Sequence, residues 1–457
     1  LKGRATADSA RAAYVIFTSG STGVPKGVTM AHGAVANTLD DMVRRFGMSP
    51  QDRVFALSSL SFDLSVYDIF APLSHGAAVV LPDPGTERDP AHWSAMLSRH
   101  GVTIWNSVPM LLDMLLVWSA SMAAALPASL RLALLSGDWV PLDLPGRLAA
   151  ASPKTRLIAL GGATEAAIWS NWQEADTVAP DWKSVPYGRP LANQYFRVLD
   201  RYGADRPDRV AGQLHIGGLG LAENYWGDPD KTAAAFITAA DTGERLYRTG
   251  DLGCFWEDGT LEFLGREDGQ VKVGGHRIEL GDITHALESH PDVARAVVLV
   301  QEASGGRQIV AHVATQAGAV LAEAALRDHC RALLPAYMVP ARFGLHVSLP
   351  LSANGKIDPK ALPAFFSRKV PAATANASPV RKILEAVIGQ RGLAADVNFF
   401  ELGATSIRLV EAHARLRREL AVDLPVTDLF VHTTIAALEA HIATLPPLSE
   451  SAATETA

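Results

Sequence analysis

One short loop restricts the fold of this chain more than any other feature. Residues 14–18 form an apolar run that predicts a buried strand, and residues 17–27 read Phe-Thr-Ser-Gly-Ser-Thr-Gly-Val-Pro-Lys-Gly. Glycines let backbone N–H groups approach phosphate oxygens, hydroxyls add donors, and Lys26 supplies a positive charge. The run is not the Walker pattern, because Pro25 precedes Lys26 and Gly27 follows it. A lone Gly/Ser loop is more often a flexible surface loop, but this ordered run after a buried strand predicts phosphate binding.

The size and composition of the chain indicate several folded domains in a reducing compartment. Its 457 residues correspond to about three domains at ~150 residues each. Hydrophobic residues make up 48% and charged residues 19%, which excludes global disorder. The net charge of −7, without a long basic run, disfavours a nucleic-acid partner. Cys254 and Cys330 are too few for a disulfide framework or a cysteine-cluster zinc site, so we expect a cytoplasmic protein.

No segment of the sequence predicts contact with a membrane. Residues 1–5 lack the apolar core of a signal peptide. The longest apolar stretch, residues 114–126, contains Ser119 and Ser121 and is shorter than the ~18 residues that a membrane span needs.

Hydrophobic patterns divide the chain into three folded regions, a linker and a tail. Residues 1–267 alternate strand-like runs with helical patterns, which predicts a large α/β region with much parallel sheet. Residues 268–365 predict a smaller α+β unit. Residues 366–378 have the small, polar composition of a linker. Residues 379–445 predict an all-helical module of the size of a carrier or docking domain, and residues 446–457 a polar tail.

Individual elements follow from the same patterns. Strands are expected at residues 14–18, 78–81, 102–105, 132–135, 213–216, 271–273, 296–300 and 309–313. Helices are expected at residues 32–46, 279–290, 320–333, 406–420 and 433–442. A first carrier helix is expected from the apolar face shared by Val380, Ile383, Leu384, Val387 and Ile388.

Six further segments follow the glycine-rich loop in a set order. They are residues 61–65 (Ser-Phe-Asp-Leu-Ser), 162–165 (Gly-Ala-Thr-Glu), 212–218, 247–252, 265–272 and 351–358. Together with the loop, these segments resemble the adenylate-forming enzymes, specifically the adenylation domains of nonribosomal peptide synthetases. Chance agreement of seven motifs in order is negligible, whereas any one of them would be weak evidence. The resemblance implies the adenylate-forming fold, with a large α/β domain that lacks its start.

The resemblance also implies a chemistry in which an amino-acid carboxylate attacks the α-phosphorus of ATP and pyrophosphate leaves. Such catalysis consists of positioning and of neutralising phosphate charge. Glu165 would bind Mg²⁺, a cation that prefers oxygen ligands, and Thr164 would contact the α-phosphate. Asp251 would bind the ribose hydroxyls, with Arg266 beside it. The pyrophosphate end would be bound by Thr18, Ser19, Gly20, Ser21, Thr22, Gly23 and Lys26.

Three residues near the small unit carry the remaining implied roles. Lys356 would bridge the substrate carboxylate and the phosphate as charge builds. Asp268 resembles the hinge about which the small domain swings between adenylation and thioester formation, and it is also a plausible turn residue. Lys272 is a candidate contact in the thioester-forming orientation. A lone charged residue is usually a solvated surface group, and only membership of a motif overrides that interpretation here.

The chain departs from the family pattern at three positions. The family has an Asn and a Tyr shortly before Thr-Glu, and both contact adenine. Ala159 and Gly161 stand at those places, so adenine stacking is expected to be weaker or supplied differently. Gly274 stands where the hinge segment often has Arg.

Residues 399–407 resemble the phosphopantetheine attachment site of peptidyl carrier proteins. The segment reads Phe-Phe-Glu-Leu-Gly-Ala-Thr-Ser-Ile, a variant that retains the hydroxyl of Ser406. A serine at a helix start is ordinarily an N-cap, but the run as a whole predicts attachment of 4′-phosphopantetheine. The implied partners are a phosphopantetheinyl transferase and neighbouring synthetase domains, such as a condensation or heterocyclisation domain.

The predicted substrate pocket suits a small amino acid. Asp63 would pair with the α-ammonium and Lys356 with the α-carboxylate. The mapped side-chain positions are Leu64, Tyr67, Asn106, Leu134, Ser136, Leu160, Ile168 and Trp169. Two aromatics fill volume and no second charge is expected, which disfavours ionic substrates. The string resembles cysteine-activating domains, so we expect L-cysteine, with serine as the nearest rival; the apolar members could also be ordinary core.

Two functions of different class stay open at this point. Family members begin well before the loop, whereas thirteen residues precede Tyr14. The chain is therefore expected to be either a working adenylation enzyme fused to its carrier, or a truncated fragment that serves only as a carrier and docking module.

Overall fold

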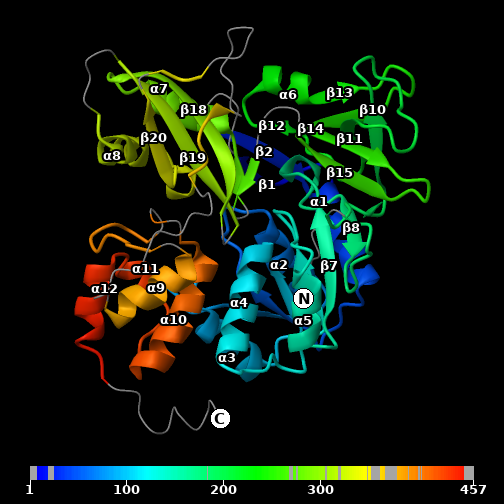
Figure 1. Cartoon of the computed structure of the whole chain (residues 1–457). Helices are drawn as coiled ribbons and strands as arrows, with labels where there is room; N and C mark the ends of the chain where they lie inside the picture. Colours follow the sequence, from blue (N-terminus) through cyan, green and yellow to red (C-terminus); the bar gives the residue numbers. More distant parts are fainter. Residues whose placement is uncertain are drawn as a thin grey trace.

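A computed structural model gives the arrangement of the chain in Figure 1. It describes residues 8–18, 25–182, 184–266, 271–273, 276–303, 306–316, 321–346, 348–350, 361–365, 378–389, 391–399, 402 and 404–446. The large region lies on one side of the picture, with the small unit and the helical module beside it.

The centre of the large region is a seven-stranded sheet in the order β4-β3-β5-β6-β7-β8-β9. Its strands are β3 (Arg53–Ala56), β4 (Ala78–Val80), β5 (Ile104–Ser107), β6 (Leu132–Leu135), β7 (Arg156–Gly161), β8 (Asn171–Glu174) and β9 (Arg189–Pro190). The five strands from β4 to β7 are parallel, because helices connect them. These helices are α2 (Leu64–Ser74), α3 (Pro90–His100), α4 (Pro109–Ser121) and α5 (Leu144–Ala151). The predicted α/β class is confirmed, and β5 begins two residues later than expected.

Outside this sheet the large region is antiparallel, so the expectation of parallel strands holds only for residues 53–161. One sheet has the order β1-β2-β12, and its first two strands precede helix α1 (His32–Arg45). Its strands are β1 (Ala12–Thr18), β2 (Lys26–Ala31) and β12 (Asn224–Tyr225). The other contains β10 (Gln194–Leu199), β11 (Gly212–Gly218), β13 (Phe236–Thr238), β14 (Arg245–Phe255) and β15 (Leu261–Arg266). Helix α6 (Pro229–Ala235) lies between β12 and β13.

The small unit is α+β, as predicted. Strands β18 (Val293–Ala303) and β19 (Gly306–Thr315) are antiparallel, and β20 (Arg342–His346) pairs with β19 in parallel. Helices α7 (Leu280–Glu288) and α8 (Glu323–Leu333) share a hydrophobic core with the sheet. A two-stranded hairpin, β16 (Val271–Val273) and β17 (His276–Ile278), precedes them, and the short helix η2 (Ala336–Met338) precedes β20.

The C-terminal module is a helical bundle with its own core. Its helices are α9 (Pro379–Ile388), α10 (Ser406–Leu420), α11 (Asp428–Val431) and α12 (Ile435–Ile442). Helix α10 also packs against α4 of the large region, and the two lie side by side in Figure 1. Val410 and Val426 belong to the same apolar cluster as Leu112 of α4. One helix therefore carries the serine and contacts the large region.

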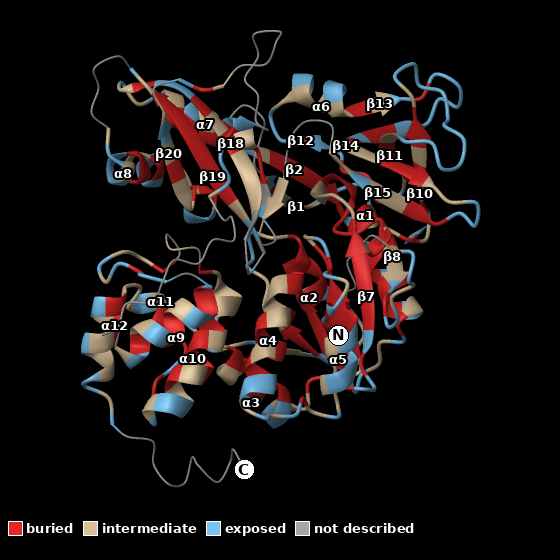
Figure 2. Cartoon of the chain, in the orientation of Figure 1, coloured by how far each residue is buried: buried red, intermediate tan, exposed pale blue. Residues whose placement is uncertain are grey.

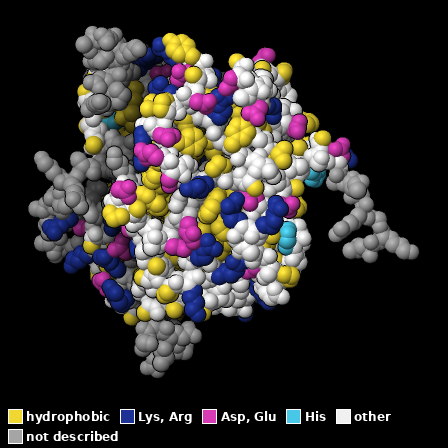
Figure 3. Space-filling model, turned by 90° about the vertical axis from the view of Figure 1, so that its right-hand side faces the viewer, with side chains coloured by type: hydrophobic (Ala, Val, Ile, Leu, Met, Phe, Trp, Pro, Cys, Tyr) yellow, Lys and Arg dark blue, Asp and Glu magenta, His cyan; other side chains and the backbone are white. Residues whose placement is uncertain are grey.

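Burial and surface charge agree with the folded domains and the mixed surface charge that the composition predicts. Figure 2 shows buried residues concentrated in the sheets and on the inward helix faces. Cys254 and Cys330 are both buried and unpaired with each other. On the face in Figure 3, Lys and Arg side chains are interspersed with Asp and Glu. Within the described ranges, none of the helices has the length and apolar character needed to cross a membrane.

Candidate functional site

Lys26, Glu165 and Tyr225 form a buried triad beside the glycine-rich loop. The ammonium Nζ of Lys26 lies 2.9 Å from Oε1 of Glu165 and donates to the Tyr225 hydroxyl at 3.0 Å. That hydroxyl donates to the same Oε1 at 2.8 Å. Glu165 is fully buried, and a buried carboxylate needs such partners. Lys26 is the first residue of β2, directly after the loop, whose residues 19–24 lie outside the described residues.

Asp63 lies on the other side of the Thr-Glu segment. It precedes α2, is 4% exposed, and accepts a hydrogen bond from the Thr164 side chain. Burial, with the nearby charge of Glu165, raises the pKa of Asp63 to about 6, although Thr164 and the positive charge of Lys272 oppose the rise. A cation placed against Asp63 would lower this pKa again, because a nearby positive charge favours the ionised carboxylate.

The β16–β17 hairpin brings the small unit against this site. Lys272 on β16 is close enough to Asp63 to lower its pKa. His276 on β17 stacks on Tyr337, with ring centroids 3.9 Å apart, and its pKa is lowered by burial and by Arg88 of the large region. Two other predicted residues, the hinge Asp268 and the catalytic Lys356, lie outside the described residues.

Asp251 and Arg266 form an ion pair across two strands. They are register partners in the β14–β15 ladder, and their charged atoms lie 2.6 Å apart. Thr249 accepts a hydrogen bond from the backbone N–H of Asp251 at 2.9 Å. The sheet register therefore places the Asp251 carboxylate beside the Arg266 guanidinium, the neighbour that the resemblance implied.

The predicted pocket residues come together around two aromatic rings. The ring centroids of Tyr67 and Trp169 are 5.0 Å apart, and both side chains are buried. The indole of Trp169 donates to the Ser136 hydroxyl at 2.9 Å. The other buried members are Leu64, Leu134, Leu160 and Ile168.

A strained turn presents Trp169 to this pocket. Ala167 and Ile168 have φ of 55° and 72°, and the N–H of Trp169 donates to the Ala167 carbonyl at 2.8 Å. This is a γ-turn with positive φ at its centre, a rare conformation that is unfavourable for a β-branched residue. Such strain persists only where the surrounding structure imposes it, and it occurs preferentially at functional sites.

A second carboxylate borders the pocket, which corrects the expectation that no further charge is present. Asp68 is fully buried on α2 and accepts from Nδ2 of Asn106 at 2.7 Å. Burial raises its pKa to about 7, so the group is partly neutral near physiological pH. The paired amide directs the other Asn106 atom, Oδ1, away from Asp68, where it finds no hydrogen-bond partner in the described part of the chain.

Three site residues carried no signal in the sequence. Tyr225 lies 199 residues from Lys26, and Asp68 is one more polar residue on an apolar helix. The buried hydroxyl of Tyr14 has its pKa raised by burial and by the charge of Asp63. Only the fold brings these groups to the motif residues, so no spacing could have identified them.

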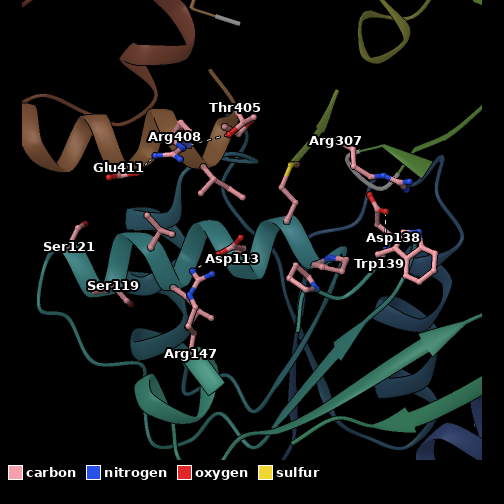
Figure 4. Close-up of a pocket in the computed structure, with 18 of the residues that line it drawn as sticks. Asp113, Ser119, Ser121, Asp138, Trp139, Arg147, Arg307, Thr405, Arg408 and Glu411 are labelled. Carbon is pink, nitrogen blue, oxygen red and sulfur yellow. Dashed lines mark hydrogen bonds and ion pairs between the residues drawn. The ribbon is translucent and has the colours of Figure 1, made fainter. Parts of the chain in front are cut away.

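Ser406 is the first residue of α10, but it does not cap the helix. Thr405 is the N-cap, and its side chain accepts from the N–H of Arg408 at 3.4 Å. The half-buried Ser406 instead borders a cavity of about 2020 Å³ between the three parts of the chain. Trp139 of the large region and Arg307 of the small unit also line this cavity, and Figure 4 shows them opposite Thr405 and Arg408.

The charged groups fit ATP and Mg²⁺ chemically. Within the described ranges, no cluster of three or more acidic, His or Cys side chains forms a metal cage. Mg²⁺ is usually bound by one or two carboxylates together with substrate phosphates and water, and the buried carboxylate of Glu165 suits that mode.

Three family models match the chain in sequence order. The AMP-binding enzyme model matches residues 2–226, and the AMP-binding enzyme C-terminal domain matches residues 282–356. The phosphopantetheine attachment site model matches residues 378–442. One model falls in each of the large region, the small unit and the helical bundle.

Two curated relatives match long stretches of this chain. The anguibactin system regulator of Vibrio anguillarum is 45% identical over 420 residues, which are 89% of this chain and 40% of that protein. Pyochelin synthetase PchE of Pseudomonas aeruginosa is 53% identical over 289 residues, which are 63% of this chain and 20% of that protein. The chain thus spans 40% or less of the length of these relatives.

Solved structures show the same fold. Holo-PA1221, a nonribosomal peptide synthetase protein with adenylation and carrier domains, aligns with a TM-score of 0.79 at 24% identity, covering 99% of this chain and 75% of that one. The synthetase FmoA3 with bound α-methyl-L-serine-AMP aligns with a TM-score of 0.55 at 41% identity, covering 78% of this chain and 34% of that one.

Proposed function

Because the chain belongs to the nonribosomal peptide synthetases, as an AMP-binding adenylation domain followed by a phosphopantetheine carrier domain, we propose that it activates one small amino acid and loads it onto its own carrier. The observation that carries this proposal is the buried cluster of Asp63, Thr164, Glu165 and Lys26. It combines a carboxylate suited to an ammonium group with a hydroxyl and a cation suited to phosphates.

In the first step the amino acid binds with its ammonium against Asp63. The buried carboxylate gains from a cation, since its raised pKa reflects desolvation. Thr164, which donates to Asp63, would contact the α-phosphate, while Lys26 and the loop before it would bind the pyrophosphate end. Asp251 accepts from the ribose hydroxyls, and Lys356 neutralises charge as the carboxylate attacks. Glu165 would hold Mg²⁺, which would supply further positive charge at the phosphates.

In the second step the aminoacyl group passes from AMP to the carrier domain. When attached to Ser406, phosphopantetheine would supply the thiol that accepts the acyl group, and AMP would leave. The cavity beside Ser406 reaches the β16–β17 hairpin through Val273 and His276, and the neighbouring Lys272 faces Asp63. This arrangement supports Lys272 as the small-unit contact of thioester formation. Asp268 would be the hinge that exchanges Lys272 for Lys356.

The substrate that we propose is L-cysteine. The support is the likeness of the pocket string to cysteine-activating domains, together with the volume filled by Tyr67 and Trp169. Serine is the alternative, because a hydroxyl and a thiol differ little in such a pocket. Asp68 does not favour a cationic substrate, since Asn106 already occupies its Oδ1 and burial favours its neutral form.

The remaining assignments follow from the same proposal. We place the domain boundaries at residues 1–267, 268–365, 366–378 and 379–445, with a tail at 446–457. The partners are a phosphopantetheinyl transferase and adjacent synthetase domains, and the two unpaired cysteines suit a cytoplasmic location.

An ATP–pyrophosphate exchange panel over the twenty amino acids tests the proposal. L-Cysteine should give the strongest exchange, followed by serine and alanine. Asp63→Ala should weaken every amino acid, because it removes the shared ammonium contact. A panel that peaks on an aromatic or charged amino acid would refute the pocket assignment, and no exchange with any amino acid would favour the carrier-only alternative.

A further inference from the structure

Gly161 marks the place where this chain lacks the tyrosine of the family. The space beside it is filled by other residues. A Cβ built on Gly161 would lie 2.8 Å from Oδ1 and 2.9 Å from Nδ2 of Asn171, and 3.2 Å from Cε1 of Tyr187. At these distances a side chain at position 161 would require the Asn171 amide to move. An amide and an aromatic ring therefore meet beside Gly161, the position at which the motif's tyrosine is missing.

Asn171 presents an unused acceptor at this point. It is the register partner of Gly161 in the β7–β8 ladder and is 1% exposed. Its Nδ2 donates to the Tyr187 carbonyl at 2.6 Å, which fixes the direction of the amide. Its Oδ1 has no hydrogen-bond partner in the described part of the protein. A buried acceptor without a donor is unfavourable, and it points to a donor supplied from outside the chain.

Tyr187 belongs to a row of aromatic rings. It stacks on Phe263 with centroids 4.9 Å apart and planes 10° apart, and Trp139 packs on Phe263 at 5.0 Å. Tyr187 is fixed to β15 through Gly188, which exchanges two backbone hydrogen bonds with Leu261. Trp139 and Phe263 also line the large cavity, so the row borders open space.

The neighbours of Asn171 and of the aromatic row indicate which kind of ligand could bind there. Thr164 follows Gly161 by three residues, and Arg266 follows Phe263 by three residues on β15. Gly161 and Phe263 are thus each three residues along the chain from a residue proposed to bind the α-phosphate or to lie beside the ribose. A flat, aromatic group with an exocyclic amine fits the row and the unused acceptor together.

We propose that the adenine of ATP packs against the Tyr187–Phe263 pair and donates its exocyclic amine to Oδ1 of Asn171. Tyr187 and Asn171 thereby replace the aromatic and amide groups that the sequence motif lacks. This inference depends on the proposed function, because it assumes that ATP occupies the site. It adds the residues that select the base.

Equilibrium binding of AMP to the full chain tests the inference without requiring turnover. Tyr187→Ala should weaken AMP binding by about 5- to 100-fold, the range expected when a base loses an aromatic stacking partner. Tyr187→Phe should bind within about twofold of wild type. Tyr202 is 79% exposed, and its hydroxyl and its ring both contact the adjacent Arg201, so Tyr202→Ala is the matched control and should change nothing.

A change in the nucleotide tests the acceptor without altering the fold. Purine riboside 5′-monophosphate lacks the exocyclic amine and should bind the wild type about 2- to 10-fold more weakly than AMP, as expected for one hydrogen bond. Asn171→Ala should abolish that preference. Phosphopantetheinylation of Ser406 in each variant reports that the carrier domain has folded.

The outcomes separate this inference from the proposed function. If AMP binds but Tyr187→Ala binds it equally well, the aromatic assignment is overturned while adenylation stands. If the wild type binds AMP and purine riboside 5′-monophosphate equally well, the assignment of Asn171 as the acceptor of the exocyclic amine is overturned. If the wild type neither binds AMP nor supports exchange, both proposals fail.

Discussion

Replacing Asp63 by Asn should stabilise the protein above pH 6 while weakening its affinity for the amino acid. The carboxylate is buried beside Glu165, and the fold raises its pKa from 3.8 to about 6. A group whose pKa is raised on folding prefers its neutral form in the folded state. Its ionisation therefore destabilises the fold, beginning as the pH rises above about 4 and complete above about 6.

The size of this effect follows from the pKa. A shift of about two units at about 1.4 kcal/mol per unit gives about 3 kcal/mol at neutral pH. Asn cannot ionise. The stability of Asp63→Asn relative to wild type should therefore rise by that amount between pH 4 and pH 7. Any change in hydrogen bonding to Thr164 adds a constant offset and leaves the pH dependence intact. Amino-acid binding should strengthen as the pH rises through about 6 in wild type and stay weak throughout in the variant.

Tryptophan fluorescence in a urea titration measures this difference. All nine tryptophans precede residue 257, so the signal reports the large region. Asp52→Asn is the matched control. Burial alone would raise the pKa of Asp52, but hydrogen bonds from Arg131 and Thr103 lower it to about 2. Its contribution is present above about pH 4 and is lost only as the pH falls through about 2, so Asp52→Asn should be destabilised by a constant amount from pH 4.5 to 7.5.

A flat difference between Asp63→Asn and wild type over the same pH range would refute the reasoning. It would mean that the carboxylate titrates near its ordinary pKa and is solvated. Asp63 would then no longer be supported as a desolvated partner for the ammonium group of the substrate.

Four other substitutions test the residue roles. Lys356→Ala should reduce adenylation by orders of magnitude but spare thioester transfer from preformed aminoacyl-AMP, with Lys272→Ala showing the reverse; equal losses in both half-reactions would contradict the division. Ser406→Ala should abolish the gain of one phosphopantetheine in the intact mass and leave exchange unchanged, so a modified variant would place the site elsewhere. Trp169→Ala should shift the exchange panel toward larger apolar amino acids, and an unchanged panel would remove Trp169 from the pocket.

Local signals predicted the helices well, because capping and apolar spacing lie within a few residues. The side chain of Ser378 caps α9, and that of Thr405 caps α10. The apolar face of α9 is buried as its spacing predicts. The cap at α10 also shows the limit of such reasoning, since two adjacent hydroxyls at 405 and 406 fit the same pattern. Only the backbone geometry assigns the cap to Thr405 and leaves the hydroxyl of Ser406 outside that role.

Strand direction was harder to predict, because it depends on connections between distant segments. Residues 53–161 alternate with helices and form the expected parallel strands. The later strands have similar composition, yet β10 and β11 pair antiparallel. The ion pair of Asp251 with Arg266 arises from one such antiparallel ladder. The motifs predicted the residue types of the site, whereas the strand pairing determines which of these residues are in contact.

Position 161 shows why a sequence motif can reveal that a residue is missing but cannot identify the residues that replace it. The sequence shows that a tyrosine is absent, but the residues that fill its space come ten and twenty-six positions later. Asn171 reaches Gly161 only through the β7–β8 register, and Tyr187 only through the bridge of Gly188 to β15. A slip of one residue in that ladder would turn the Asn171 side chain to the opposite face of the sheet. The lost aromatic and its replacement are therefore linked by strand register, and the base site depends on a pairing that no local pattern encodes.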